Sequence, residues 1–273
     1  MPKYVKTELE KDNKIKAIKE FTDREKPRKV FWNQYEKLKN ALDNKTDIPI
    51  QVIYYYGIGG IGKTSLLQKI RDEIKEHDKK IKYTYLDYDK LLNFNNNTID
   101  VLKYIESDLK DKYKFQFPLF DLAFYQYEIK QGKSASKPEL KKILEGNDEL
   151  NFLLDIASEI PLVGTFYKIF NYANAGQNIL RNKFKDSKLE KRFINLDNDS
   201  SEQLEKYLPY YFAQDMKDNL KKEKLPFVFM IDTYDKLVNE LTDGVYATRN
   251  DDYLRDDEGL ILNIPNVLWV MRV

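Results

Sequence analysis

The sequence contains no cysteine and only one histidine among its 273 residues. Without cysteine the chain forms no disulfide, offers no thiol nucleophile and lacks the thiolate ligands of most structural zinc sites. The single histidine, His77, has no second histidine with which to share a metal site or a proton relay. We therefore interpret His77 as a surface residue.

An excess of either charge is also missing, because 46 basic side chains stand against 45 acidic ones, for a net charge of +1. Surfaces that bind nucleic acid or an anionic membrane need a basic excess, so we expect neither as a partner. Apolar residues make up 42% of the chain and aromatic residues 14%. A disordered chain has far fewer of both, so we expect a folded globular protein.

Long apolar runs are absent as well. The most apolar stretch, Ile160–Phe170, contains Pro161 and Lys168, and it is far shorter than the roughly 20 residues that cross a bilayer. We interpret the wider stretch 153–169 as the core of a helical region, with membrane or partner contact as the alternative. Residues 1–16 alternate in charge and lack an apolar segment, so we expect no secretory signal and a cytoplasmic location.

The apolar residues that are present predict an α/β fold with a mainly parallel sheet. Three short apolar runs, 48–56, 227–232 and 267–271, have the pattern of strands buried on both faces. Residues 81–87 predict a further strand, and an amphipathic helix that carries Leu66, Leu67, Ile70 and Ile74 precedes it. A strand, a helix and a strand in this order form a βαβ unit with a right-handed crossover. We expect a three-layer core of this type.

The remaining segments predict the domain organisation. We expect a helical lead-in over 1–45, the first part of the core over 46–90, a large helical insertion over 91–224 and the second part of the core over 225–273. Within the insertion, Ser201 is the expected cap of a helix that Pro209 kinks or splits.

The turn after the first predicted strand carries the strongest functional signal. Residues 57–64 read Gly-Ile-Gly-Gly-Ile-Gly-Lys-Thr, which matches the phosphate-binding loop G-x-x-x-x-G-K-[ST]. Glycine lets the backbone approach a phosphate without a Cβ clash, and successive N–H groups at a helix N-terminus attract the anion. The sequence therefore predicts a site for ATP, or for GTP as the alternative, with Mg²⁺. The expected nucleotide-binding residues are Gly57, Gly59, Gly60, Gly62, Lys63, Thr64 and Ser65.

Two roles within this turn follow from side-chain chemistry. Lys63 would bind the outer phosphates, and the hydroxyl of Thr64 would be a ligand of Mg²⁺. The same glycines also satisfy the dinucleotide motif G-x-G-x-x-G, for which Asp87 would supply the later acidic residue. A lysine directly after the last glycine has no task in a dinucleotide site, so we favour the triphosphate. A dinucleotide-binding oxidoreductase is the remote alternative, and a turn without a ligand is the third.

A second acidic site is predicted where the apolar run 227–231 ends at Asp232. An aspartate in this position holds Mg²⁺ in phosphate-loop enzymes. The next residue, Thr233, cannot act as a carboxylate base, so we expect the nearest acid, Asp235, to be catalytic. The alternative for Asp235 is a favourable charge at the start of a helix over 234–241. For Asp87 the alternatives are a site residue and a strand end.

These motifs resemble those of the STAND class of signal-transduction ATPases, relatives of the NB-ARC and AAA-type proteins. The resemblance rests on Gly-Ile-Gly-Gly-Ile-Gly-Lys-Thr-Ser-Leu-Leu at 57–67 and Phe-Val-Phe-Met-Ile-Asp-Thr-Tyr-Asp-Lys-Leu at 227–237. Phe-Thr-Asp-Arg-Glu at 21–25 is similar to an element upstream of the phosphate loop, and Val-Leu-Trp-Val-Met-Arg at 267–272 to the sensor strand.

The resemblance implies a five-stranded core in which the sensor strand lies between the two motif-bearing strands. It implies that Arg272 reaches the γ-phosphate and that Arg24 lies near the adenine or ribose. The class continues past the sensor strand to a fifth strand and a helical lid, whereas this sequence ends at Val273. We therefore expect the front part of such an ATPase, with the phosphate-loop strand at an exposed edge.

Taken together, the residues and the resemblance predict an ATP-binding switch ATPase of signalling or defence type that hydrolyses ATP slowly. Self-association, or an effector or sensor protein, is the expected kind of protein partner. The alternative is a nucleotide-binding interaction module without catalysis.

Overall fold

A computed structural model of the chain describes residues 24–46, 50–58, 61–91, 98–134, 136–145, 187–238, 241–242, 245–246 and 251–273. The chain divides into two units. The first, which we call the sheet unit, comprises Met1–Asn93, Glu223–Arg249 and Asn266–Val273. The second, the helical unit, comprises Phe94–Lys222 and Asn250–Pro265.

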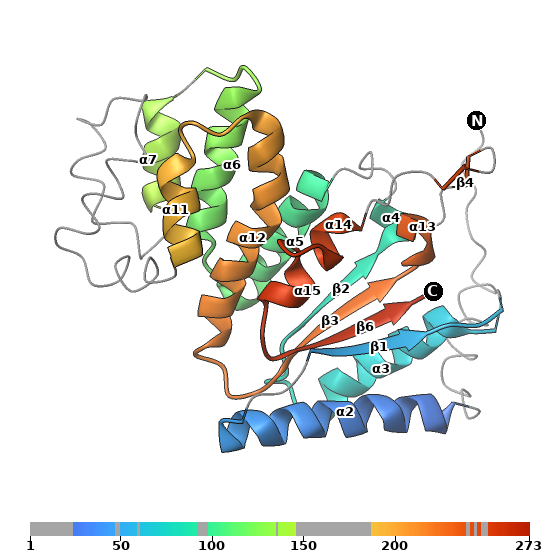
Figure 1. Cartoon of the computed structure of the whole chain (residues 1–273). Helices are drawn as coiled ribbons and strands as arrows, with labels where there is room; N and C mark the ends of the chain where they lie inside the picture. The colour runs from blue at the N-terminus through green and yellow to red at the C-terminus, as the bar shows by residue number, and fades with distance from the viewer. Residues whose placement is uncertain are drawn as a thin grey trace, which may run out of the picture. The chain divides into compact units, whose positions relative to one another are not determined.

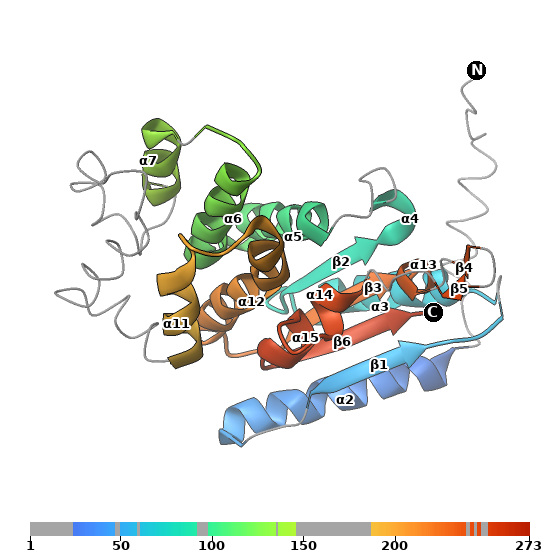
Figure 2. The same ribbon diagram turned by 45° about the horizontal axis from the view of Figure 1, so that its top comes forward.

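Four parallel strands form the sheet, in the order β1-β6-β3-β2. They are β1 (Gln51–Tyr55), β2 (Tyr83–Asp87), β3 (Phe227–Asp232) and β6 (Val267–Arg272), and Figures 1 and 2 show them side by side. The predicted α/β class with a parallel sheet is therefore confirmed. The order also places β6 between the two motif-bearing strands, β1 and β3, as the resemblance implied.

Strand β1 differs from its prediction. It spans Gln51–Tyr55 instead of 48–56, and of its five residues only Ile53 is buried, while Tyr54 is 44% exposed. The reason is position, because β1 lies at an edge of the described sheet and has one neighbouring strand. By contrast, every residue of β3 is buried between its two neighbours, as the apolar run predicted.

Two helices, α2 (Glu25–Asn44) and α3 (Lys63–His77), lie against one face of the sheet (Figure 1). Helix α2 buries Phe31, Tyr35 and Leu38 at helical spacing. The core that these helices share with the strands comprises Phe31, Tyr35, Leu38, Ile53, Leu66, Leu67, Ile70, Ile74, Ile81, Val228, Met230, Leu268 and Val270. This packing fixes the first turn of α3, which carries Lys63 and Thr64, relative to the ends of β3 and β6.

Short elements follow the carboxyl ends of the strands. Helix α4 (Tyr88–Leu91) follows β2, and helix α13 (Asp235–Val238) follows β3. The predicted helix over 234–241 is therefore too long. Instead, Leu241 begins β4 (Leu241–Thr242), which pairs antiparallel with β5 (Val245–Tyr246).

The helical unit contains α5 (Thr98–Tyr113), α6 (Pro118–Lys130), α7 (Lys137–Glu145), α11 (Ser187–Asn195), α12 (Ser201–Leu220), α14 (Asp252–Arg255) and α15 (Leu260–Asn263). Helix α12 contacts α5, α6, α14 and α15. Residues 250–265 thus belong to this unit, whereas the predicted second part of the core ran over 225–273.

Helix α12 corrects two predicted details. Its N-cap is Ser200 and not Ser201, because the Ser200 hydroxyl accepts a hydrogen bond from the N–H of Gln203, and the Gln203 side chain accepts one from the N–H of Ser200. Pro209 does not split the helix, which continues from Ser201 to Leu220. Buried residues on both sides of Pro209, such as Leu208 and Tyr211, hold the helix together despite the missing hydrogen bond.

In the ranges that the structure describes, no helix is both long and apolar enough to cross a membrane. The apolar stretch 153–169 lies outside the described residues.

A buried carboxyl pair joins α5 to α6 in the helical unit. Glu106 is 2% exposed and Asp121 is 8% exposed. Burial, together with a hydrogen bond to Asp121, raises the pKa of Glu106 to about 7. Burial also opposes ionisation of Asp121, but hydrogen bonds from Glu106 and from Lys110, whose Nζ lies 2.8 Å from Oδ2, lower the pKa of Asp121. Glu106 is therefore the protonated member of the pair.

We expect Glu106→Gln to change how stability depends on pH. Between the ordinary glutamate pKa of 4.5 and the folded value of about 7, the folded chain keeps a proton at Glu106 that the unfolded chain loses. The free energy of unfolding of the wild type therefore falls as the pH rises through this window. Glutamine stays neutral, so the variant should gain roughly 2 kcal/mol relative to the wild type between about pH 5 and about pH 8.

Urea denaturation at several pH values measures this difference. Glu145→Gln, at an exposed position of α7, is the matched control and should follow the wild type. If the free energy of unfolding of Glu106→Gln changed with pH in parallel with that of the wild type, Glu106 would be ionised in the folded chain over this whole pH range.

Candidate functional site

The strand–turn–helix that the motif predicted is present at the carboxyl end of β1. The strand ends at Tyr55, the chain turns through Gly57, and α3 begins at Lys63 with Gly62 as its N-cap. Gly62 has a φ of 85°, a left-handed conformation that glycine adopts without strain. Gly59 and Gly60 lie outside the described residues. In parallel sheets, ligands bind at this edge, beyond the carboxyl ends of the strands.

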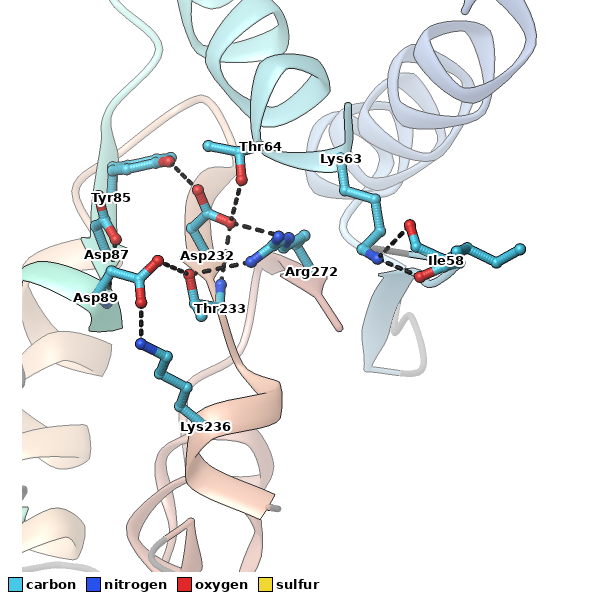
Figure 3. Close-up of polar contacts among 11 residues, drawn as sticks. Ile58, Lys63, Thr64, Tyr85, Asp87, Asp89, Asp232, Thr233, Lys236 and Arg272 are labelled. Carbon is cyan, nitrogen blue, oxygen red and sulfur yellow. Dashed lines mark hydrogen bonds and ion pairs between the residues drawn. The ribbon is translucent and has the colours of Figure 1, made fainter. Parts of the chain in front are cut away.

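The side chain of Lys63 is folded into this turn and is 6% exposed. Its Nζ contacts the carbonyl oxygen of Gly57 and donates to that of Ile58 at 3.3 Å (Figure 3). The ammonium group thus lies against the backbone of the loop at Gly57 and Ile58. Ser65 follows in the first turn of α3 and is half-buried.

Arg24 lies beside the same turn. It is the N-cap residue of α2, and its guanidinium group contacts the backbone oxygen of Ile61. The structure therefore brings Arg24 next to the phosphate loop across 37 positions of sequence. Its expected place near the adenine or ribose stays a prediction.

Asp232, at the end of β3, is the centre of the site and is 1% exposed. Its Oδ1 accepts hydrogen bonds from the Thr64 hydroxyl at 3.4 Å and from the backbone N–H of Thr233 at 3.0 Å, and it lies 3.4 Å from Nε of Arg272. Its Oδ2 accepts a hydrogen bond from the Tyr85 hydroxyl at 2.6 Å. Figure 3 shows these groups around the carboxylate. Hydroxyl and carboxylate oxygens are the ligands that Mg²⁺ prefers, so Thr64 and Asp232 could hold this ion between them.

Arg272 reaches the site from the end of β6. Besides its ion pair with Asp232, its Nη1 donates to Oγ1 of Thr233 at 3.1 Å. The residue that the resemblance named as the sensor arginine is thus part of the Asp232 cluster.

Thr233 has an unusual backbone, with a φ of 61°. For a β-branched residue this left-handed conformation costs energy, and surrounding contacts must hold it. The N–H donates to Asp232, and Oγ1 accepts from Arg272 and donates to Oδ2 of Asp89 at 3.4 Å. Asp89 also contacts Lys236, and that hydrogen bond lowers the pKa of Asp89.

The two remaining acids lie at the margin of the cluster. Asp235 begins α13, and in the part of the chain that the structure describes its buried Oδ1 has no hydrogen-bonding partner. Within the described ranges, no hydrogen bond or ion pair joins its side chain to Asp232. Asp87 is the register partner of Asp232 on β2, and it accepts the N–H of Asp89 at 3.2 Å and pairs with Lys90 at 2.8 Å. Such contacts are typical of a strand-end residue.

Tyr85, Asp89 and Lys236 are site residues that the sequence did not indicate. Burial, and then the hydrogen bond to Asp232, raises the pKa of Tyr85 above its usual value. The phenol therefore keeps its proton and is the donor in this bond. The only sequence signal for Tyr85 was its place in the predicted strand 81–87, on the same side of the strand as Asp87.

Comparison with known proteins agrees with this geometry. A family model described as the KAP family P-loop domain matches residues 31–248. This segment includes the Gly57–Thr64 turn and Asp232. No curated protein and no solved structure matches the chain significantly.

The ion pair of Asp232 with Arg272 leads to a prediction for the protein without nucleotide. Arg272→Ala leaves a buried carboxylate without its cation, so we expect the free energy of unfolding to fall by about 2–3 kcal/mol. The double variant Arg272→Ala/Asp232→Asn should recover part of this loss, because the unpaired charge is gone.

Urea denaturation of the single and double variants measures both effects. Lys29→Ala, which removes the cation of an exposed ion pair with Glu25, is the control and should cost less than about 0.5 kcal/mol. An equal loss in the single and double variants would show that Arg272 acts through packing and not through its charge.

Proposed function

The chain belongs to the KAP family of P-loop domains, and from this premise we propose that it binds ATP with Mg²⁺ and hydrolyses it slowly, as a conformational switch of signalling or defence type. The observation that carries the proposal is the 3.4 Å contact between the Thr64 hydroxyl and Asp232. Because these residues are 168 positions apart, the fold unites the two groups that a Mg²⁺ site of this class requires.

The phosphates would lie in the turn between Gly57 and Thr64. Backbone N–H groups of the loop and of the first turn of α3 would donate to the phosphate oxygens. Lys63 supports this placement, because its ammonium group already contacts the loop carbonyls of Gly57 and Ile58. A bound triphosphate would give that buried cation partners of opposite charge.

Mg²⁺ would be held by Thr64 and Asp232, and it would neutralise negative charge on the outer phosphates. Arg272 is proposed to contact the γ-phosphate, which its place beside Asp232 supports. Arg24 is proposed to lie near the adenine or ribose, and its contact with Ile61 of the phosphate loop supports this.

For hydrolysis we assign Asp235 to orient the attacking water. Thr233, directly after Asp232, carries no carboxylate, and Asp235 is the next acid along the chain. Among the residues that the structure describes, none bonds to the buried Oδ1 of Asp235, so this oxygen could accept a proton or a hydrogen bond.

A second candidate function is a nucleotide-binding interaction module that does not hydrolyse its ligand. The observation in its favour is that Asp235 is separate from the Asp232 cluster. In the described ranges, neither a hydrogen bond nor an ion pair joins the Asp235 side chain to that cluster. The remote dinucleotide alternative has less support, because a dinucleotide site uses neither a lysine in the place of Lys63 nor a hydroxyl–carboxylate pair such as Thr64 and Asp232.

We expect Mg·ATP to stabilise the wild type and Lys63→Ala to remove that effect. A ligand at about 100 times its Kd stabilises by about 2.7 kcal/mol, which raises Tm by roughly 5–10 °C for a chain of this size. Lys75→Ala, at an exposed position of the same helix, is the matched control and should keep the full shift.

Thermal unfolding with ATP, GTP and NAD, each with Mg²⁺, measures ligand choice in the same experiment. A full shift in Lys63→Ala would place the nucleotide elsewhere, and a shift with NAD alone would favour the dinucleotide alternative.

Phosphate release separates the switch ATPase from the binding module. We expect Asp235→Asn to lower the rate of release by about 100-fold or more, because the water loses its orienting group, while the ATP-induced Tm shift stays unchanged. Asp257→Asn, at an exposed position of the helical unit, is the control. A wild type that shows the full Tm shift but releases no phosphate would establish the binding module.

A further inference from the structure

Both carboxylate oxygens of Asp232 have polar partners, and the two oxygens differ in the charge of those partners. Tyr85 donates to Oδ2 at 2.6 Å from β2, while Nε of Arg272 lies 3.4 Å from Oδ1 at the end of β6. Figure 3 shows the two side chains reaching the carboxylate from opposite sides. The Thr64 hydroxyl donates to the same oxygen that Arg272 approaches. Oδ2 is therefore held by a neutral donor, whereas Oδ1 is shared between the Thr64 hydroxyl and the guanidinium group of Arg272.

The phenol of Tyr85 is itself held in place. Its ring is partly buried and packs against the core between α3 and the sheet. The guanidinium carbon of Arg71, on α3, lies 5.3 Å from the ring centre. Because the ring is fixed on two sides, its hydroxyl presents the donor to Asp232 from one direction.

This donor has a consequence for the pairing of Asp232 with Arg272. A carboxylate that is free to rotate pairs with guanidinium through both oxygens, in a fork that is stronger than a single contact. The bond from Tyr85 holds Oδ2 on the side of β2, whereas Arg272 comes from β6 on the other side of β3, and Nη1 of Arg272 bonds to Thr233 instead. Arg272 is therefore limited to a single, 3.4 Å approach to Oδ1.

We propose that Tyr85 is a positioning residue that keeps Oδ1 of Asp232 directed to Thr64 and Mg²⁺, and that Arg272 competes with Mg²⁺ for this oxygen. This inference rests on the proposed nucleotide binding and deepens it. The two cations repel each other at one carboxylate oxygen, so binding of Mg²⁺ requires Arg272 to withdraw. The γ-phosphate of ATP offers Arg272 another anion, whereas ADP has no such group. The competition is therefore strongest with ADP.

A Mg²⁺ titration at a fixed ADP concentration tests the positioning role, with the ADP-induced Tm shift of the full chain as the readout. Tyr85→Phe removes only the hydroxyl, and we expect the Mg²⁺ midpoint to rise about tenfold, equivalent to about 1.4 kcal/mol. The shift produced by ADP in EDTA should stay at the wild-type value, because the phosphate turn is unchanged. Tyr83→Phe removes a hydroxyl from the same side of β2 and should leave the midpoint unchanged.

Arg272→Gln tests the competition in the same titration. Loss of the competing charge should lower the Mg²⁺ midpoint about threefold or more. In the double variant with Tyr85→Phe, the effect of the lost hydroxyl should shrink below about threefold, since no guanidinium is left to capture a rotated carboxylate. A purely structural role of Tyr85 would give the same effect in both backgrounds.

Each result is decisive. A Tyr85→Phe midpoint equal to that of the wild type overturns the positioning role, and an Arg272→Gln midpoint that is unchanged or raised overturns the competition. If Tyr85→Phe does not fold, the Mg²⁺ midpoint of Arg272→Gln alone decides the proposal, and a midpoint that is unchanged or raised overturns it. A wild type that shows no shift with ADP or ATP at any Mg²⁺ concentration overturns the proposed function itself, and this inference with it. A wild-type shift with unaltered variants overturns the inference alone.

Discussion

The buried charge of Asp232 is the constraint on which the rest of the site depends. A carboxylate that is 1% exposed is stable only when donors and a cation satisfy its oxygens. These partners come from four elements or their ends: Thr64 from α3, Tyr85 from β2, Thr233 from the end of β3 and Arg272 from β6. The strand order places β6 and β2 on either side of β3, so Arg272 and Tyr85 approach the carboxylate from opposite sides. The order of the strands in the sheet thus determines which side chains surround Asp232.

The parts of this arrangement that the sequence predicted are those governed by local physics. A phosphate turn needs a residue without a Cβ where the chain enters the helix, and Gly62 takes a φ of 85° there. A central strand buried on both faces needs a continuous apolar run, and β3 has one that ends at Asp232. The parallel sheet and the P-loop family are confirmed. The roles assigned to Lys63, Asp235 and Arg272 stay predictions.

The parts that escaped prediction depend on contacts between segments. Tyr85 meets Asp232 only because β2 pairs with β3 in the register that sets Asp87 opposite Asp232, and the alternating pattern of 81–87 does not specify a partner strand. The predicted helix over 234–241 is too long because α13 ends at Val238 and Leu241 pairs with Tyr246 instead, a contact that the local sequence does not specify. The prediction that Pro209 splits its helix is wrong for the opposite reason, since tertiary burial on both sides of Pro209 outweighs a local rule.

Thr233 links the Asp232 cluster to the start of α13 through a strained backbone. Its left-handed backbone, with a φ of 61°, stores on the order of 1–3 kcal/mol and is held by bonds to Asp232, Arg272 and Asp89. Any ligand that draws Arg272 away from Asp232 also removes one of the bonds that hold this strain. Thr233 directly precedes the turn into α13, where Asp235 begins. In the proposed switch, a change at the carboxylate would therefore reach the neighbouring acid through this one strained residue.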